Sequence, residues 1–132
     1  MSKPLAQISQ AGVAVWLDDL SRDRINNGSL KKLIAEDNVV GVTTNPSIFA
    51  ASIGKSDLYE NDILQNKVKS IEDVITKLTT DDVRNACDLF QTAFKSSDGV
   101  DGRVSIEVDP RFARDTLATV KQGKQLWEII DR

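Results

Sequence analysis

The sequence contains no histidine and only one cysteine among its 132 residues. Without histidine, the chain offers no Ser-His-Asp or Cys-His catalysis, no imidazole base and no histidine-ligated zinc site. Its single cysteine, Cys87, forms neither an internal disulfide nor a cysteine-only zinc site. Cys87 falls on the apolar face of a predicted helix, so we expect it to pack in the core rather than to act as a nucleophile. Acid–base chemistry must therefore come from carboxylates, lysines, tyrosine or water.

Long apolar runs and clusters of one charge are also missing. The 17 basic and 20 acidic residues are mixed along the sequence, which argues against a nucleic-acid partner and against binding to an anionic membrane. Residues 1–10 lack the apolar run of a signal peptide, and no segment approaches the length of a membrane span. We therefore expect a cytoplasmic protein with no membrane partner, and the sequence predicts no particular oligomeric state.

Three short segments have the β-branched composition and the Gly, Asp or Pro boundaries that are typical of strands. They are Val13–Asp18, Val39–Asn45 and Arg103–Val108. Helical patterns fill the intervals, so we expect the strands to pair in parallel through helical crossovers. The sequence therefore predicts an α/β fold, and residues 1–132 show no linker that would divide them into two domains.

Two helical stretches flank the second predicted strand. A broken helix is expected over Ser21–Asp37, interrupted at Asn26–Gly28, with Ser29 capping its second half. After the strand, Pro46 fits the first position of a short helix that Gly54 would end. Another short helix is expected over residues 58–65.

Ser70 and Thr79 each precede an acidic residue by three positions, as in a capping box. This spacing predicts one helix over residues 71–78 and a second over residues 81–95. A last helix is expected within residues 112–130. Two of these helices show apolar residues at helical spacing, namely Val83, Ala86, Cys87, Phe90, Ala93 and Phe94 in the first, and Ala113, Leu117, Val120, Trp127 and Ile130 in the second.

Alternation of side chains gives each predicted strand one aliphatic face and one mixed or polar face. An open doubly wound sheet usually has two apolar faces, whereas a barrel packs its aliphatic faces on the helices and turns the others inward. The residues on the mixed faces are Ala14, Trp16 and Asp18; Val39, Gly41, Thr43 and Asn45; and Arg103, Ser105 and Glu107. This pattern predicts the first three βα units of a (β/α)₈ barrel, whose full length is about 250 residues.

Asp18, Asn45 and Glu107 each lie on the mixed face at the carboxyl end of a predicted strand. Active sites of barrels and open α/β sheets form at that end, so these three residues are candidates for one catalytic cluster. The alternative is that the strands simply become polar where the core ends.

Each candidate has a chemical role and a structural alternative. Asp18 is a candidate general acid or base, and Glu107 is a candidate for proton exchange with a bound water. An ion pair with Arg103 or another basic side chain is the structural alternative for Glu107. Asn45 offers a donor and an acceptor to a hydroxyl-bearing ligand, or else it shapes the turn before Pro46.

Three segments together resemble the transaldolase family: VWLDDLS at 15–21, GVTTNPSIF at 41–49 and DGRVSIEVDPR at 101–111. Their order and spacing match that family, and their form resembles its actinobacterial branch. The resemblance covers nearly the whole chain but only about the first third of a family member. It implies a class I aldolase-like (β/α)₈ barrel of the pentose phosphate pathway, of which residues 1–132 are the N-terminal part.

The resemblance also implies a reaction and a set of roles. The family moves a dihydroxyacetone unit between sugar phosphates through a lysine Schiff base, without a metal or an organic cofactor. By this resemblance, Asp18 is the acid–base aspartate and Glu107 acts through a water in forming and hydrolysing the Schiff base. Asn45 holds hydroxyls of the bound three-carbon unit, and Thr43 supports Asn45 from one step below on the same face.

The family's Schiff-base lysine lies on a fourth strand, in a segment like FIKIPAT, which these 132 residues do not contain. None of the ten lysines lies on a predicted strand, and a solvated helix lysine is a poor nucleophile at neutral pH because it stays protonated. We therefore expect the chain alone to be inactive. A non-catalytic α/β module that binds a partner stays open as an alternative, as does a Mg²⁺-dependent phosphotransferase using Asp18.

Overall fold

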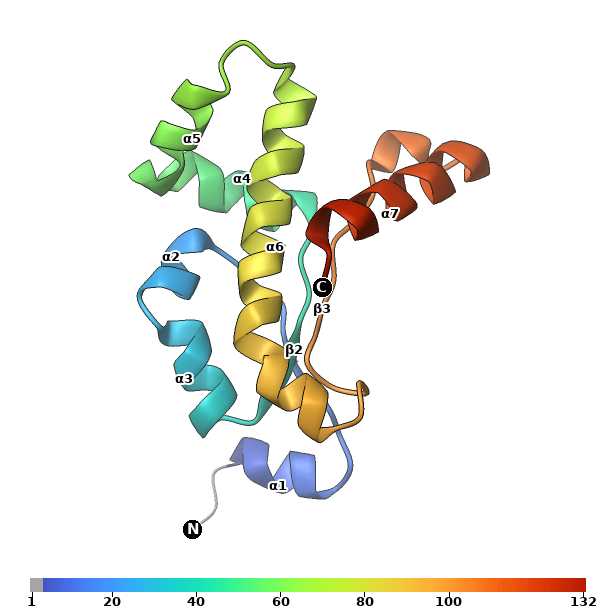
Figure 1. Ribbon diagram of the computed structural model, residues 1–132. Helices are drawn as coiled ribbons and strands as arrows, with labels where there is room; N and C mark the ends of the chain where they lie inside the picture. The colour runs from blue at the N-terminus through green and yellow to red at the C-terminus, as the bar shows by residue number, and fades with distance from the viewer. Residues whose placement is uncertain (1–3) are drawn as a thin grey trace.

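The computed structural model describes residues 4–132, so Met1–Lys3, the start of the segment examined for a signal peptide, lie outside the described residues. The chain forms a three-stranded sheet surrounded by helices (Figure 1). Its elements are, in order, α1 (Pro4–Gln10), β1 (Val15–Leu17), α2 (Arg22–Asn26), α3 (Ser29–Glu36), β2 (Val39–Val42), α4 (Pro46–Lys55), η1 (Asp57–Tyr59), α5 (Glu60–Gln65), α6 (Ile71–Ser96), β3 (Arg103–Val104), η2 (Pro110–Phe112) and α7 (Thr116–Ile130).

The strands lie in the order β1-β2-β3 and both pairs are parallel, as the βα pattern predicts. Each strand is shorter than predicted. Pairing of β2 with β3 ends at Val42 and Val104, with one more backbone hydrogen bond from Ser105 N to the carbonyl of Val42, and the chain after β2 turns into α4. Glu107 therefore lies in an extended segment after β3 rather than on the strand itself.

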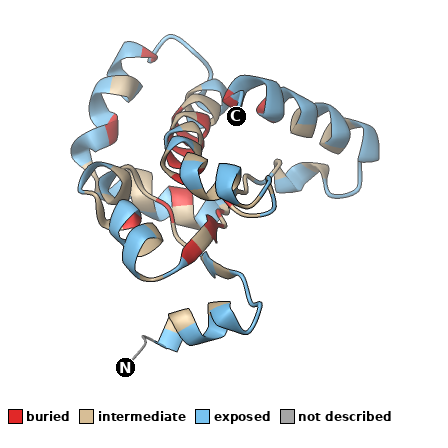
Figure 2. Ribbon diagram, turned by 60° about the horizontal axis from the view of Figure 1, so that its bottom comes forward, coloured by how far each residue is buried: buried red, intermediate tan, exposed pale blue. Residues whose placement is uncertain are grey.

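The aliphatic faces of the strands pack on the helices, as expected from the alternation. Val15 and Leu17 of β1 and Val104 of β3 lie against a core cluster that also contains Val42. The buried members of that cluster come from the loop after β1, α3, the sheet, α4, α6 and the end of α7, and they are Leu20, Leu30, Val39, Val42, Phe49, Val83, Ala86, Phe90 and Ile130. Figure 2 shows buried residues along α6 and on the sheet.

Val39 contradicts the predicted alternation, because it lies in the core with Val42 instead of on the mixed face. The pairing of β1 with β2 explains this difference: Val15 pairs with Val39, but Trp16 pairs with Gly41. The additional residue in β2 is a bulge, which resets the faces. Trp16 then covers Gly41 so closely that a Cβ there would lie 2.5 Å from Trp16 Cε2. This close approach requires glycine at position 41.

A single continuous helix, α6, replaces the two helices predicted before the third strand. Ser70 does cap it, since its hydroxyl accepts a 3.1 Å hydrogen bond from Asp73 N. Thr79 does not cap a second helix: its hydroxyl donates to the carbonyl of Ile75, as a threonine within a helix does. Thr79 and Asp82 are both buried, so packing against the rest of the fold favours an uninterrupted helix here.

The two pieces of the first helical region are confirmed, but their caps differ from the prediction. Ser21, not predicted as a cap, accepts a 3.1 Å hydrogen bond from Arg24 N at the start of α2. Gly28, with a φ of 79°, occupies the N-cap position of α3 in place of Ser29. Gly54 does not end α4, which continues to Lys55.

Helix α7 packs on α6 near its C-terminal end, contacts the segment after β3 through Thr119 and Gln122, and projects away from the sheet (Figure 1). Leu126 and Ile130 are buried, and the Arg84 guanidinium of α6 binds the carbonyls of Ile129 and Ile130. Most of the apolar face predicted for this helix is exposed in the structure. Leu117 is 84% exposed and Trp127 is 68% exposed. Helix α1, which the sequence analysis did not predict, lies beside β1.

Candidate functional site

Asp18 and Thr43 meet at the carboxyl ends of β1 and β2. Thr43 N donates a 2.8 Å hydrogen bond to the carbonyl of Leu17, which extends the pairing of the two strands by one residue. The Thr43 hydroxyl then donates a 2.6 Å hydrogen bond to Oδ1 of Asp18. Thr43 thus contacts Asp18 and not Asn45, the residue it was expected to support. The Asp18 side chain is exposed, and the hydrogen bond fixes the direction in which its carboxylate points.

Asn45 is the N-cap of α4, in extended backbone with φ −151° and ψ 168°. Its Oδ1 accepts a 2.9 Å hydrogen bond from Ile48 N. This oxygen therefore has the structural role that the sequence offered as an alternative, which is to shape the turn around Pro46. Within residues 4–132, the Nδ2 group of Asn45 has no hydrogen-bond partner. One side-chain atom therefore holds the helix, and two N–H donors stay available to a ligand.

Glu107 and Asn45 line the same cavity, which has a volume of about 680 Å³. Glu107 is exposed, and no ion pair joins it to Arg103 within the described part of the chain. Arg103 is held elsewhere, because its guanidinium binds the carbonyl of Gly99 and lies 4.8 Å from the centroid of the Phe94 ring. The predicted ion-pair alternative with Arg103 is therefore wrong.

The segment that carries Glu107 is fastened to the end of β2 through Thr44 and Ser105. Ser105 Oγ accepts a 3.2 Å hydrogen bond from Thr44 N, and the Thr44 hydroxyl donates a 2.8 Å hydrogen bond to the carbonyl of Ser105. Thr44 is only 2% exposed, so this double contact is shielded from water. It sets where the chain leaves β3, two residues before Glu107.

The four candidate residues thus form two neighbouring pairs. Asp18 bonds to Thr43, and Asn45 shares a cavity with Glu107. The pairs are linked by the consecutive residues 43–45 at the end of β2. Asp18 does not line the 680 Å³ cavity, whose walls are mostly apolar side chains of α4, α6 and α7 and of the segment after β3. A second cavity of about 620 Å³ lies on the other side of Asn45, beside Asp19 and Ser21.

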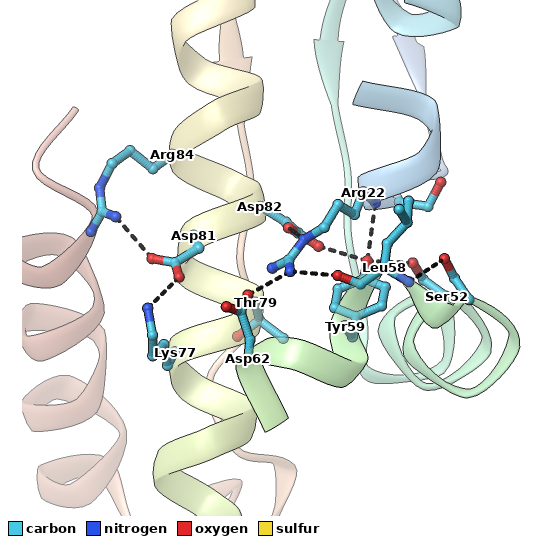
Figure 3. Close-up of polar contacts among 12 residues, drawn as sticks. Arg22, Ser52, Leu58, Tyr59, Asp62, Lys77, Thr79, Asp81, Asp82 and Arg84 are labelled. Carbon is cyan, nitrogen blue, oxygen red and sulfur yellow. Dashed lines mark hydrogen bonds and ion pairs between the residues drawn. The ribbon is translucent and has the colours of Figure 1, made fainter. Parts of the chain in front are cut away.

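A buried polar cluster beside these residues was missed by the sequence analysis. Asp82 of α6 is fully buried; it accepts a 2.8 Å hydrogen bond from Arg22 Nε and a 2.7 Å hydrogen bond from the hydroxyl of Tyr59, which is also fully buried (Figure 3). Spacing could have revealed it, because Asp82, Ala86 and Phe90 are four residues apart and share the buried face of one helix. An acid on that face needs a buried partner.

Burial decides the direction in which the pKa values of Asp82 and Tyr59 are shifted. It raises the pKa of the Asp82 carboxyl, while the hydrogen bonds from Tyr59 and Arg22 act in the opposite direction. Burial also raises the pKa of Tyr59, so this phenol stays protonated at neutral pH. Among residues 4–132, no group of three or more histidine, cysteine, aspartate or glutamate side chains is arranged to hold a metal ion.

Comparison with known proteins places this arrangement in a family. The family model described as transaldolase/fructose-6-phosphate aldolase matches residues 15–132. The chain belongs to the transaldolase/fructose-6-phosphate aldolase family. This match spans β1, β2 and β3 and includes Asp18, Thr43, Asn45 and Glu107.

Individual family members show how much of a transaldolase this chain represents. It is 55% identical over 130 residues to a transaldolase of Mycolicibacterium smegmatis, covering 97% of this chain and 35% of that protein. It is 49% identical to a transaldolase of Thermobifida fusca and 50% identical to one of Kocuria rhizophila, covering all of this chain and 36% of each relative. The chain therefore spans about a third of the length of the curated relatives it matches, and it corresponds to an N-terminal portion.

Proposed function

We propose that residues 1–132 form the first three βα units of a transaldolase (β/α)₈ barrel. In this proposal the complete enzyme moves a dihydroxyacetone unit from a ketose phosphate to an aldose phosphate, in the cytoplasmic pentose phosphate pathway. Family membership, the parallel order β1-β2-β3 and the aliphatic faces turned toward the helices support it. Within residues 4–132, no helix is long and apolar enough to cross a lipid bilayer.

The observation that carries the proposal is the hydrogen bond between Thr43 and Asp18 at adjacent strand ends. In the proposed reaction, the Asp18 carboxylate takes the proton of a substrate hydroxyl as the neighbouring carbon–carbon bond breaks, and it returns the proton in the reverse direction. The Thr43 hydroxyl occupies Oδ1, which leaves Oδ2 to face the substrate. A carboxylate held in this way loses less freedom when the substrate binds.

Asn45 and Glu107 have separate roles in the proposal. The free Nδ2 donors of Asn45 bind hydroxyl groups of the three-carbon unit, while its Oδ1 keeps α4 in place. Glu107 exchanges protons with a water during formation and hydrolysis of the Schiff base. The exposed carboxylate of Glu107 and the cavity that it shares with Asn45 support this role, because both groups reach the same space.

The Schiff-base lysine of the proposal is not among the described residues of the three strands. Every lysine from Lys31 to Lys124 lies on a helix or in the turn and bend between α5 and α6, and Lys3 lies outside the described residues. A nucleophilic lysine must be deprotonated, which requires a buried or electropositive site rather than an exposed helix surface. We therefore propose that the chain alone has no transaldolase activity.

Borohydride trapping on the full-length gene product tests the proposal. With fructose 6-phosphate present, reduction is expected to attach the substrate to one lysine beyond residue 132, and the 132-residue chain alone is expected to gain no adduct. Mapping the adduct to a lysine within residues 1–132, or finding none on the full-length protein, would refute the proposal.

Neighbouring aspartates provide the matched control. Asp18→Asn is expected to form the trapped adduct but to lose transfer to erythrose 4-phosphate by at least about a hundredfold, in the range usual for a lost acid–base group. Asp19→Asn removes the adjacent carboxylate, which pairs with Arg24, and should keep transfer within about threefold. Equal losses in the two variants would count against an acid–base role for Asp18.

A further inference from the structure

The hydroxyl of Tyr59 is the meeting point of three segments of the chain. It accepts a 3.0 Å hydrogen bond from the backbone N–H of Arg22, which begins α2. It donates a 2.7 Å hydrogen bond to Oδ2 of Asp82 on α6. It also lies 2.7 Å from the hydroxyl of Ser52 on α4. The phenol has one proton, which Asp82 receives, so Ser52 must donate. The single oxygen of Tyr59 thus makes three directed contacts.

Arg22 completes the cluster from the other side (Figure 3). Its guanidinium donates to Asp82 through Nε at 2.8 Å, and through Nη1 to Asp62 at 2.6 Å and to the carbonyl of Leu58 at 3.2 Å. It also lies 4.3 Å from the centroid of the Tyr59 ring. This planar fork reaches several acceptors at fixed angles, a geometry that lysine does not reproduce.

The position of this cluster indicates more than a contribution to stability. Arg22 begins α2, four residues after Asp18 and at the end of the loop that follows β1, and Ser52 lies on α4, the helix whose N-cap is Asn45. The cluster therefore joins the two segments that carry Asp18 and Asn45 and fastens both to α6. A buried ion pair is poor evidence for stability by itself, because apolar residues of the same volume often stabilise as well. Fixed geometry is what such a network adds.

We infer that Tyr59, Arg22 and Asp82 act as positioning residues, which hold the loop after β1 and the start of α4 in the relative placement that catalysis needs. This inference rests on the proposed function, because it concerns the placement of Asp18 against Asn45. A shift of about 1 Å in a catalytic group lowers rates by up to about a hundredfold. Loss of one hydrogen bond in the cluster should therefore lower the rate while the fold persists.

Tyr59→Phe and Asp82→Asn test this inference in the full-length gene product. Tyr59→Phe keeps the ring and leaves Arg22 N, Ser52 and Asp82 without their shared partner. The assay divides the maximal rate by the number of sites that borohydride traps with fructose 6-phosphate. This ratio is kcat per trapped site, and it does not count unfolded molecules. Each variant is expected to lose about tenfold to a hundredfold in kcat per trapped site. A purely structural role would lower kcat and trapped sites together and leave their ratio unchanged.

Asp81→Asn is the matched control for Asp82→Asn. Asp81 is the preceding residue of α6 and is also ion-paired, with Lys77 at 2.6 Å and Arg84 at 3.0 Å, but it points toward α7 (Figure 3). Its side chain is 25% exposed, whereas that of Asp82 is fully buried. We expect Asp81→Asn to keep kcat per trapped site within about twofold.

Ser52 provides a milder pair if Tyr59→Phe does not fold. Ser52→Ala removes only the hydroxyl that donates to Tyr59, and Ser52→Thr restores it. The expected result is a loss of about threefold to tenfold in kcat per trapped site for Ser52→Ala, with recovery in Ser52→Thr. Unchanged ratios in the folded variants, with an active wild type, would overturn the inference alone. A wild type that traps no substrate would overturn the proposed function as well.

Discussion

Asp18 and Thr43 are 25 residues apart in the sequence, yet the Thr43 hydroxyl donates a 2.6 Å hydrogen bond to the Asp18 carboxylate. Parallel pairing of β1 with β2 brings them together, because the carboxyl ends of parallel strands lie at the same edge of a sheet. The contact makes position 43 part of the proposed site through the orientation of Asp18 rather than through Asn45.

Replacing Thr43 by valine keeps the β-branched shape and removes this hydrogen bond. We expect kcat of the full-length enzyme to fall about tenfold, the effect of losing a hydrogen bond to a charged group in a partly exposed setting. Thr43→Ser keeps the hydroxyl and should stay within about twofold of the wild type. Steady-state kinetics with fructose 6-phosphate and erythrose 4-phosphate measure both variants. A valine variant with the full rate would show that the contact is not used.

Gly41 and Gly54, two of the three glycines without a positive φ, are expected to have opposite effects on stability when replaced by alanine. At Gly41 an added Cβ would lie 2.5 Å from Trp16 Cε2, and Gly41→Ala should destabilise the fold by about 1–3 kcal/mol through overpacking. At Gly54, within α4, no atom outside the adjoining residues and the helix's own backbone lies within 4 Å of the added Cβ, and Gly54→Ala should stabilise by about 0.5–1 kcal/mol. Urea titrations followed by circular dichroism compare the two. Equal effects would contradict the close approach of Trp16.

Serine capping gives a further pair of variants. Ser70→Ala removes the cap of α6 and should lower the free energy of unfolding by about 1 kcal/mol. Ser29→Ala removes only a 3.3 Å hydrogen bond to the carbonyl of Arg24, because Gly28 holds the cap position of α3, and should cost less than about 0.5 kcal/mol. Denaturant titration measures the free energy of unfolding of both variants. A larger loss for Ser29→Ala than for Ser70→Ala would support the sequence prediction that Ser29 caps its helix.

Cys87 is expected to react slowly in the folded state. Burial raises the pKa of its thiol, with the neighbouring Asp88 carboxylate acting in the same direction. The thiolate is therefore scarcer at neutral pH in the folded chain than in the unfolded chain. Labelling with an aromatic disulfide reagent should be at least about tenfold slower without urea than with it, and it should accelerate as the pH rises through the alkaline range. Equal rates in the two states at pH 7 would contradict the burial of this residue.

The folded state binds the thiol proton more tightly because the pKa of Cys87 is raised. The stability linked to this proton is fully present below the ordinary thiol pKa and is lost as the pH rises through the folded value. Cys87→Ala removes that loss. Urea titrations of the wild type and the variant at neutral and alkaline pH would show whether the gap between them changes in this direction.

The bare apolar surface of α7 and the open edge of β3 predict self-association of the 132-residue chain when it is produced alone. Leu117, Val120 and Trp127 are all at least half exposed. A variant with Leu117→Gln and Trp127→Gln should shift sedimentation profiles toward the monomer, while Lys124→Gln on the same helix should not. A single sharp monomer boundary for the unmodified chain would contradict this expectation.

The three strand positions and the parallel pairing follow from the sequence pattern, so the sequence predicts them well, whereas the alternation of faces fails at Val39 because of the bulge in β2. The same information fails where distant residues decide the local structure. Thr79 and Asp82 have the spacing of a helix start, but burial against the rest of the fold continues α6 through them. Likewise, the length of β3 depends on where β2 stops offering a partner, which places Glu107 beyond the strand.

In the candidate site, too, the sequence predicts what local residues decide and misses what distant residues decide. The alternation of side chains along the strands and the family motifs select Asp18, Asn45 and Glu107. They do not reveal that Thr43 donates a hydrogen bond to Asp18. The cluster around Tyr59 joins residues up to 60 positions apart, from Arg22 to Asp82, and no local pattern announces such a contact. The one local signal is the spacing of Asp82 with Ala86 and Phe90, which places an acid on the buried face of α6 and requires a buried partner for it.

Helix α6 carries adjacent acids that hold it in two directions. Successive residues of an α-helix point about 100° apart, so Asp81 and Asp82 reach opposite neighbours from one turn. Turning α6 about its own axis would relax one set of contacts and stretch the other. The two sets of contacts therefore fix the rotation of α6 about its own axis. Both α7 and the loop after β1 take their orientation from this one helix.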